Sequence, residues 1–502
     1  MKKLLSVLLI VTMLAGMLTI MPVAEETDYT GYTEIATEAD LLKFIDDVNE
    51  DGEGDMYYVL TADITLTQVW EEIEWFAGVL DGNGHKITLT QPMADSMFDM
   101  LDLTAIIKNL TIDGINLSGN KEIYGFCNEN NGQIWDVNFT NVTLASEATD
   151  VGLINKNQED GVISRVTATV NITGKGDRAA GLAVRNYGVI RYCTMYGTIK
   201  SNYHVGGFSS DAKAATFEGC INYATIIATC SRAAGISATN RDNTTFKNCI
   251  NYGTLLAWRV NDASKKTDTK LSGMGCWNNK NDGGVVAENC LNVGLLVGNE
   301  GSTCIGAMSA ETNVGSSNPG TAVTTFTNCY TLAGVINKFT NTNHTDANFD
   351  YTQYTAYADI GVDATQPAFN GTEVTAEALK SAEMITKLGS AFQLNTGADK
   401  DQYPIILVAD TTVAPSPVIE NDDQGGNDDQ GGQQGGTTNP PAGGDDKDDE
   451  TEPVTEAPTT PATNAPADED EGGCASVVGG ASVALLAIAA TVPALIRKKK
   501  ED

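Results

Sequence analysis

The chain has 502 residues, of which 41% are hydrophobic and 19% charged, and its formal net charge is −35. This acidity argues against nucleic acid as a partner, because phosphate binding needs clustered Lys and Arg. The acidic residues are unevenly distributed along the chain, since residues 420–471 hold 16 Asp and Glu against one Lys. The remainder is moderately acidic, as in many secreted proteins, and solubility explains it.

The N-terminal region predicts export and then a cap. Two lysines and an apolar run from Leu4 to Ile20 are typical of a secretory signal, here residues 1–24. Residues 25–80 are expected to form an N-terminal cap. Thr37 is placed as the N-cap of a helix over about 38–49, because apolar residues then recur at helical spacing.

A repeat of 26 to 29 residues follows. A glycine before an apolar residue recurs at Gly125, Gly152, Gly181, Gly207 and Gly235. Short β-rich runs, such as 134–139, 162–170, 189–194 and 225–229, alternate with Gly and Asn turns. A fixed period of this length predicts stacked coils, in which each strand pairs in parallel with its equivalent one turn away. We therefore expect a β-solenoid over residues 81–340, with the glycines at tight corners or at positive φ.

Two further columns follow the same period. An Asn column is interpreted as structural, each amide bonding the next in the stack: Asn130, Asn157, Asn186, Asn240 and Asn278. A Cys column has metal binding or disulfides as alternatives, but stacked side chains point the same way and favour a buried apolar stack of free thiols: Cys193, Cys220, Cys249, Cys290 and Cys329.

The C-terminal part leaves the repeat. Residues 341–410 are expected to form a second cap, with an amphipathic helix over about 375–388. Residues 411–473 are rich in Pro, Gly, Thr, Asp and Glu and predict a disordered linker. Residues 474–502 predict a membrane anchor or sorting tail, because the apolar run 475–496 is long enough to span a bilayer and basic residues follow it. The solenoid would then lie outside the cell.

Several stretches carry a family resemblance. These are residues 35–42, 58–64 and 78–87, the glycine corners, and the closing Tyr403-Pro404-Ile405. On the basis of these stretches, the region 33–407 resembles bacterial cell-surface proteins of the GLUG-motif type. Such proteins are similar in fold to pectate-lyase-like parallel β-helices. The resemblance implies an all-β fold: a right-handed parallel β-helix (β-solenoid) with helical caps, a disordered linker and one C-terminal transmembrane helix. No Leu-Pro-x-Thr-Gly signal is present, and Cys474 precedes the tail as in other tripartite sorting signals, which makes it the candidate site of anchor processing.

The sequence favours one class of function and leaves two alternatives. The three histidines, His85, His204 and His344, are isolated, so no zinc-peptidase motif, metal site or cofactor is expected. The preferred hypothesis is a bacterial surface protein, displayed beyond the cell wall, for adhesion or for binding a glycan or host matrix ligand. A polysaccharide lyase or glycoside hydrolase is the first alternative, with candidates that spacing alone does not bring together: Asp177, Arg178, Arg185 and Arg191. A passive surface spacer is the second.

Two coils are lengthened, and inserted loops are where solenoids tend to place function. The insertions are 258–270 and 311–322. The first is basic on an acidic chain and carries a Trp that can stack on sugar rings. We expect it to be the ligand-binding loop, with acidic polysaccharide as the ligand to test first, through Trp258, Arg259, Lys265, Lys266 and Lys270.

Overall fold

The computed structural model describes residues 28–50, 52, 54–229, 231–257, 269–278, 286–299, 303–312, 325–339, 371–395 and 405–416. All of them belong to one compact unit, Met1–Asn427, and the second unit, Asp428–Asp502, contains none of them. The expected signal peptide and the apolar run 475–496 therefore lie outside the described residues. Within the described part, no helix is both long and apolar enough to cross a bilayer.

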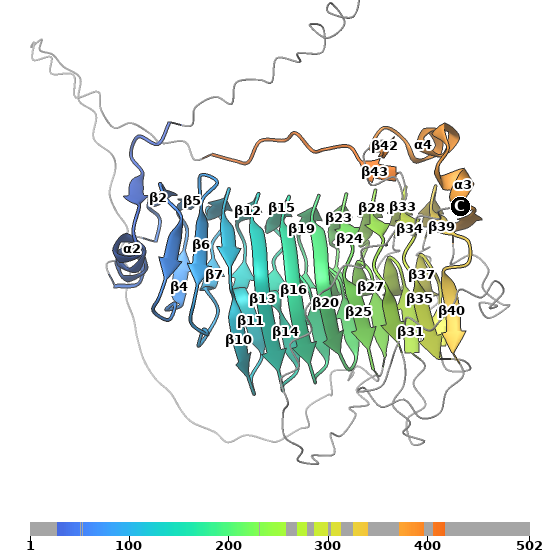
Figure 1. Ribbon diagram of the computed structural model, residues 1–502, viewed down its shortest axis with the longest axis horizontal. Coiled ribbons are helices and arrows are strands. Elements are labelled where there is room, and N and C mark those ends of the chain that lie inside the picture. Colours follow the sequence, from blue (N-terminus) through green and yellow to red (C-terminus); the bar gives the residue numbers. More distant parts are fainter. Residues whose placement is uncertain are drawn as a thin grey trace, which may run out of the picture. The chain divides into compact units, whose positions relative to one another are not determined.

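The unit is a parallel β-solenoid built from three sheets (Figure 1). Sheet A stacks β1 (Thr33–Ile35), β2 (Tyr57–Leu60), β5 (Val79–Asp81), β8 (Ile106–Lys108), β12 (Gln133–Trp135), β15 (Val162–Ser164), β19 (Val189–Arg191), β23 (Thr216–Glu218), β28 (Thr245–Lys247), β33 (Val286–Glu288) and β38 (Thr325–Thr327). Sheet B stacks β3 (Ile64–Leu66), β6 (Lys86–Leu89), β9 (Thr111–Asp113), β13 (Asn138–Ser146), β16 (Thr167–Gly174), β20 (Thr194–Ser201), β24 (Ile221–Asn222), β29 (Ile250–Asn251), β34 (Leu291–Asn292), β39 (Tyr330–Leu332) and β41 (Thr372–Val374), flanked by β10 (Asn116–Gly119), β25 (Thr225–Ala228), β30 (Leu255–Ala257), β35 (Leu296–Asn299) and β40 (Ile336–Phe339).

Sheet C completes each coil. It stacks β4 (Ile73–Phe76), β7 (Phe98–Leu101), β11 (Ile123–Asn130) and β14 (Asp150–Asn157), and then splits into paired strands: β17 (Arg178–Ala180) and β18 (Ala183–Asn186), β21 (His204–Gly206) and β22 (Ser209–Lys213), β26 (Arg232–Ala234) and β27 (Ser237–Arg241), β31 (Thr269–Ser272) and β32 (Gly275–Asn278), β36 (Thr303–Ile305) and β37 (Ser309–Thr312). The chain passes through sheets C, A and B in turn, as in β14, β15 and β16. Each described pairing between coils is parallel, which confirms the β-solenoid expected from the period.

The corner between sheets A and B holds one residue at positive φ in each of eight successive coils, from the β8–β9 corner onward. These residues are Asn109, Asp136, Arg165, Tyr192, Gly219, Asn248, Asn289 and Asn328, with φ between 49° and 64°. The left-handed conformation turns the strand sharply. The expected continuous strands 134–139, 162–170 and 189–194 are therefore wrong: each is broken at this corner into a strand of sheet A and a strand of sheet B.

The glycine column is explained by close approach. A Cβ on Gly181 would lie 2.3 Å from the Gly207 carbonyl oxygen, and one on Gly207 would lie 2.1 Å from that of Gly235. Gly181, Gly207 and Gly235 lie at the bend between the paired strands of sheet C, as expected for a tight corner, whereas Gly125 and Gly152 lie within the continuous strands β11 and β14. Positive φ, the alternative reason, is wrong for these glycines, which are absent from the positive-φ residues described.

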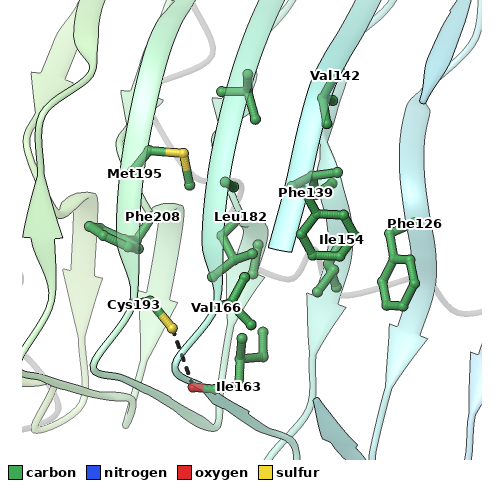
Figure 2. Packing of buried hydrophobic residues seen from close by; sticks show 14 of the residues in the cluster. Phe126, Phe139, Val142, Ile154, Ile163, Val166, Leu182, Cys193, Met195 and Phe208 are labelled. Atoms are coloured by element: carbon green, nitrogen blue, oxygen red, sulfur yellow. Dashed lines mark hydrogen bonds between the residues drawn. The ribbon is translucent and has the colours of Figure 1, made fainter. Parts of the chain in front are cut away.

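The interior is a continuous apolar core that includes the Cys column. Figure 2 shows Cys193 among Met195, Phe208 and Val166, with its Sγ donating to the Ile163 carbonyl oxygen at 3.7 Å. The five aligned cysteines are all buried and free, and each thiol donates to backbone carbonyls. The apolar-stack interpretation is thereby confirmed for the described side chains.

The Asn column is hydrogen-bonded as expected over three coils. Asn130 Nδ2 donates to Asn157 Oδ1 at 2.7 Å, and Asn157 Nδ2 donates to Asn186 Oδ1 at 2.8 Å. A second ladder, which was not predicted, joins Asn222, Asn251 and Asn292 at 2.8 Å per step. All six amides are fully buried, so each ladder satisfies groups that would otherwise destabilise the interior.

Helices cover two regions of the solenoid. Helix α2 (Glu38–Glu50), close to the prediction, packs Leu41, Phe44 and Ile45 into the first coils of the core. The other predicted helix is divided into α3 (Ala376–Leu379) and α4 (Ala382–Leu388), because the Ser381 hydroxyl caps the second one. Instead of only ending the stack, these two helices pack on an apolar column outside sheet B, which runs through Ile250, Leu291 and Tyr330.

The chain then turns back along the solenoid. Strand β42 (Phe392–Leu394) pairs antiparallel with β43 (Ile405–Leu407). Residues 408–416, called the strap here, follow (Figure 1, orange). Asp410 pairs with Arg165 at 3.1 Å, and Lys108 Nζ donates to Ser416 Oγ at 3.2 Å. The first residues of the expected linker thus contact the solenoid.

Candidate functional site on sheet C

The outer face of sheet C carries two rows of polar, mostly charged side chains. The first row places Asp150, Arg178, His204, Arg232 and Lys270 in register on successive strands. These residues alternate with Val151, Ala179, Val205, Ala233 and Leu271, which lie in the core. Successive side chains of a strand point to opposite faces, so the first row points outward.

The second row runs beside the first on the other strand of each pair. It holds Lys156, Arg185, Asp211 and Thr239 in register. The chain bends between the rows, and their side chains meet across that bend: Arg232 Nη1 donates to Thr239 Oγ1 at 3.2 Å. Small buried side chains, Ala234, Ala238, Cys276 and Ala310, pack together as a separate cluster from the main core.

Ion pairs link the charged side chains of this face, and one of them, Arg185–Asp150, joins the two rows. Arg185 Nη2 lies 2.6 Å from Asp150 Oδ2, and Arg178 Nη1 lies 3.1 Å from Asp177 Oδ2. Two coils further on, Arg241 Nη2 lies 2.5 Å from Asp211 Oδ2. We call the following residues the charged cluster: Asp150, Asp177, Arg178, Arg185, His204, Asp211, Arg232 and Arg241.

The two buried carboxyl groups of the cluster have perturbed acidities. Asp150 is 0% exposed and Asp211 is 6% exposed. Burial raises the pKa of each above its ordinary value, although nearby arginines oppose the shift. Such pairs of carboxyls on one face are a feature of glycosidic-bond chemistry, but here ion pairs hold both of them.

His204 is a neutral hydrogen-bond donor. Its Nε2 lies 3.0 Å from Arg232 Nη1, and an arginine can only donate, so Nε2 is the acceptor and Nδ1 carries the proton. Burial, followed by Arg232 and Arg178, holds the pKa of His204 well below its ordinary value. Nδ1 is buried and has no hydrogen-bond partner, although Asp177 Oδ1 is 3.8 Å away.

The cluster also holds other buried polar atoms without hydrogen-bond partners. They are Asp150 Oδ1, Arg178 Nε, Asp211 Oδ1 and Arg241 Nε. Together with His204 Nδ1 they provide three donors and two acceptors on one face of the sheet. Buried polar groups in folded proteins are nearly always paired, so these atoms mark a place where water or a ligand is expected.

The structure brings together three of the four residues suggested for catalysis. Asp177, Arg178 and Arg185 lie in the charged cluster, whereas Arg191 lies on sheet A, with its guanidinium 4.7 Å from the Trp135 ring centroid. The inserted segment ends at the same cluster, because Lys270 is in register with Arg232. Trp258, Arg259, Lys265 and Lys266 lie outside the described residues, as does Cys474.

Sequence reasoning missed His204, Arg232 and Asp211. A signal was present: Arg178, His204, Arg232 and Lys270 each stand three residues before a glycine of the corner column or its continuation at Gly273. A shallow pocket of about 380 Å³ lies elsewhere, beside Tyr29, Asn83 and Asp136, and contains none of the candidate residues. Among the described residues no cluster of His, Cys, Asp and Glu suits a metal ion.

Comparisons with known proteins add little. No protein-family model matches the sequence, and no curated protein matches it. Among solved structures, the chain is similar to an immunoglobulin A1 protease-like protein from Bacteroides ovatus. The two are 16% identical, with a TM-score of 0.38, over 76% of this chain and 93% of that one. A likeness at this level carries no argument about what this chain does.

Proposed function

We propose that this protein is a bacterial surface β-solenoid that binds an extracellular glycan or matrix ligand through the outer face of sheet C. The observation that carries the proposal is the position of Lys270. This residue ends the basic insertion and stands beside Arg232 in the first row. The predicted ligand-binding loop and the charged cluster are therefore continuous along the chain.

The remaining features support display outside the cell. We propose that the chain is related to the GLUG-motif surface proteins that it resembles, and that its solenoid has the right-handed, pectate-lyase-like form. The N-terminal signal would export the chain, the acidic linker would extend it past the cell wall, and residues 475–496 would hold it in the membrane, with its N-terminus outside. Cys474 is the proposed site at which a transpeptidase would act if the tail is exchanged for a wall attachment.

A glycan array tests the binding function. The full-length chain in detergent is compared with a variant carrying Trp258→Ala and Gln at Lys265, Lys266 and Lys270. We expect the native chain to bind a subset of glycans and the variant to bind them more weakly. Binding that involves the lysines should also weaken as salt increases, because ions screen exposed charges. A chain that binds no glycan, or a variant that binds equally at every salt concentration, would contradict the proposal.

A polysaccharide lyase or glycoside hydrolase is a second candidate. Asp150 and Asp211 favour it, because both are buried carboxyls with raised pKa on one face. The test is incubation with the glycans that bind, followed by assays for new reducing ends and for unsaturated products. The passive spacer predicts neither binding nor cleavage, so the array and these assays distinguish all three functions.

A further inference from the structure

We infer that the N-terminal end of sheet C binds a basic, amphipathic peptide through exposed apolar side chains that stand among carboxylates. This end consists of β4, β7 and the corner that leads into sheet A, beside helix α2 (Figure 1). It is separate from the charged cluster, which begins on β14, and the inference goes beyond the proposed glycan binding. We call it the Trp75 surface, and it comprises four apolar residues and the carboxylates next to them in the sequence: Met56, Trp75, Met100 and Leu103, with Asp55, Glu74, Asp99 and Asp102.

The four apolar side chains are accessible to a partner. Trp75 and Met56 are each 42% exposed, and Leu103 is 58% exposed. Trp75 is in register with Met100 of the next coil, whose side chain is half-buried. Residues in register on neighbouring strands point to the same face, so the indole and the thioether lie side by side. Single exposed apolar residues are ordinary, but several in one place mark an interaction surface.

The Trp75 ring is held in position without a partner. It lies against Gly54, where an added Cβ would come within 2.7 Å of ring atom Cε3. Its Nε1 donates to Asp102 Oδ2 at 3.0 Å. Met56 and Leu103 follow Gly54 and Asp102 by two residues and one residue, so these contacts bring the three exposed side chains together. A ring that is already ordered loses little conformational freedom when a partner binds.

The acidity of the solenoid is concentrated at this end. Residues 28–104 hold 18 Asp and Glu against two Lys, whereas residues 105–339 hold 18 Asp and Glu against 19 Lys and Arg. The two lysines lie away from the Trp75 surface, because Lys43 pairs with Asp47 on α2 and Lys86 lies on sheet B. The four carboxylates of the surface therefore produce a local negative potential, which attracts cations.

Apolar side chains among carboxylates favour a peptide over a membrane or a nucleic acid. Anionic lipids and phosphates would be repelled by this surface. The Lys and Arg side chains of a basic peptide can pair with the carboxylates, and a cation over the indole of Trp75 adds a cation–π contact. The apolar side chains of the same peptide can pack on Met56, Met100 and Leu103. Because methionine side chains adapt to differently shaped partners, we expect a class of basic amphipathic peptides to bind.

Three synthetic peptides separate the contribution of charge from that of apolar contact. The first alternates Lys with Phe and Leu, the second has Glu in place of Lys, and the third has Ser in place of Phe and Leu. Each is titrated calorimetrically into the full-length chain in phosphatidylcholine nanodiscs, and the heat measured with empty nanodiscs is subtracted. We expect the first peptide to bind at least about tenfold more tightly than the other two. Its affinity should fall as the salt concentration rises. Equal binding of the first peptide and either of the others would overturn the inference.

A pair of aromatic variants locates the apolar contact. Trp75→Ala should weaken binding of the first peptide about tenfold or more, because a central aromatic residue commonly dominates such a surface. Tyr196→Ala removes a ring that is 40% exposed on sheet B and should leave the affinity within about twofold. Equal effects of the two variants would show that the peptide does not bind at the Trp75 surface.

A pair of charge variants locates the carboxylates. Asp55→Asn combined with Glu74→Gln should weaken binding and reduce its dependence on salt, since both side chains are exposed beside the apolar residues. Glu159→Gln combined with Asp160→Asn removes the same charge from the turn between β14 and β15, at the same corner of a later coil, and should do neither. If the second pair weakens binding as much as the first, the attraction is general and the inference is wrong.

Two further measurements keep the outcome unambiguous. Melting curves identify any variant that fails to fold, and the comparison of the three peptides needs no variant. Sedimentation of the full-length chain shows whether it associates with itself. Self-association that Trp75→Ala abolishes, together with no binding of the first peptide, would assign the surface to a second copy of the chain and overturn the inference. Glycan binding should be the same in Trp75→Ala as in the native chain, so this inference and the proposed function can fail independently.

Discussion

Ala212 interrupts a buried ladder of asparagine amides, and filling this position tests how the solenoid is stabilised. Ala212 is in register with Asn186 on one side and Asn240 on the other, and it is fully buried. Asn186 Nδ2 is buried without a hydrogen-bond partner, because the next coil offers a methyl group where an amide would accept. We expect Ala212→Asn to continue the ladder from Asn186 and to raise the free energy of unfolding.

The size of the effect follows from the groups involved. Leaving a buried polar group unpaired costs roughly 1–3 kcal/mol, so pairing Asn186 Nδ2 should recover about that amount. Ordering the new side chain costs up to about 1 kcal/mol. We expect a net gain of about 1–2 kcal/mol, provided that the added atoms fit as they do at Asn157, since overpacking alone would cost roughly 1–3 kcal/mol.

Urea unfolding followed by circular dichroism measures this difference. The midpoint should rise while the slope stays constant, which shows that stability rather than the unfolded state has changed. Ala212→Leu is the matched control, because it adds similar volume without an amide and should lower the midpoint. If Ala212→Asn lowers the midpoint as much as Ala212→Leu, the ladder does not stabilise this position and the reasoning fails.

Three other predictions follow from burial and from the termini. His204 has a folded-state pKa below its unfolded value, so the free energy of unfolding should fall as the pH drops below about 6.5, by up to about 1.4 kcal/mol per pH unit. In urea unfolding at pH 7, 6 and 5, His204→Gln should remove that part of the dependence of the free energy of unfolding on pH. The same pH dependence in both proteins would show that the imidazole is not held neutral. Cys249→Ser should cost about 1–3 kcal/mol by burying a hydroxyl among apolar side chains, and thiol titration of denatured, unreduced protein should find the five aligned cysteines reactive, whereas blocked thiols would indicate disulfides. Deleting 475–502 should release the solenoid into the medium, while Cys474→Ala should alter only processing, and a deletion variant that stays on cells would refute the anchor.

Much of the fold could be predicted because stacking repeats the same chemical environment at a fixed interval. The glycine corners, the Asn ladder and the Cys column each occupy one kind of site in successive coils, so the residue type recurs in the sequence. The corner between sheets A and B was missed for the opposite reason. Its left-handed position is filled by Asn, Asp, Arg, Tyr or Gly in different coils, including Arg165 and Tyr192, so no single residue type reveals it.

The charged cluster was only partly predictable, because its members belong to different coils. Arg178 and Arg191 are both arginines of one coil, yet one points out of sheet C and the other out of sheet A. Their places depend on where the chain turns between them. Counting from the glycine column would have aligned Arg178, His204 and Arg232. The bend that joins the two rows, through Arg232 and Thr239, required coordinates.

The strap determines where a pulling force would enter the molecule. Chain beyond Ser416 is tied first to Lys108, in the fourth strand of sheet A, and then at Asp410 to Arg165, before it reaches the C-terminal helices. Tension on the tail would therefore load these two side-chain contacts one after the other, first the contact at Lys108 and then the contact at Arg165. The hydrogen bonds between coils would bear load only after the strap had peeled away. The strap therefore lies in series with the solenoid and would take up tension on the tail before the coils do.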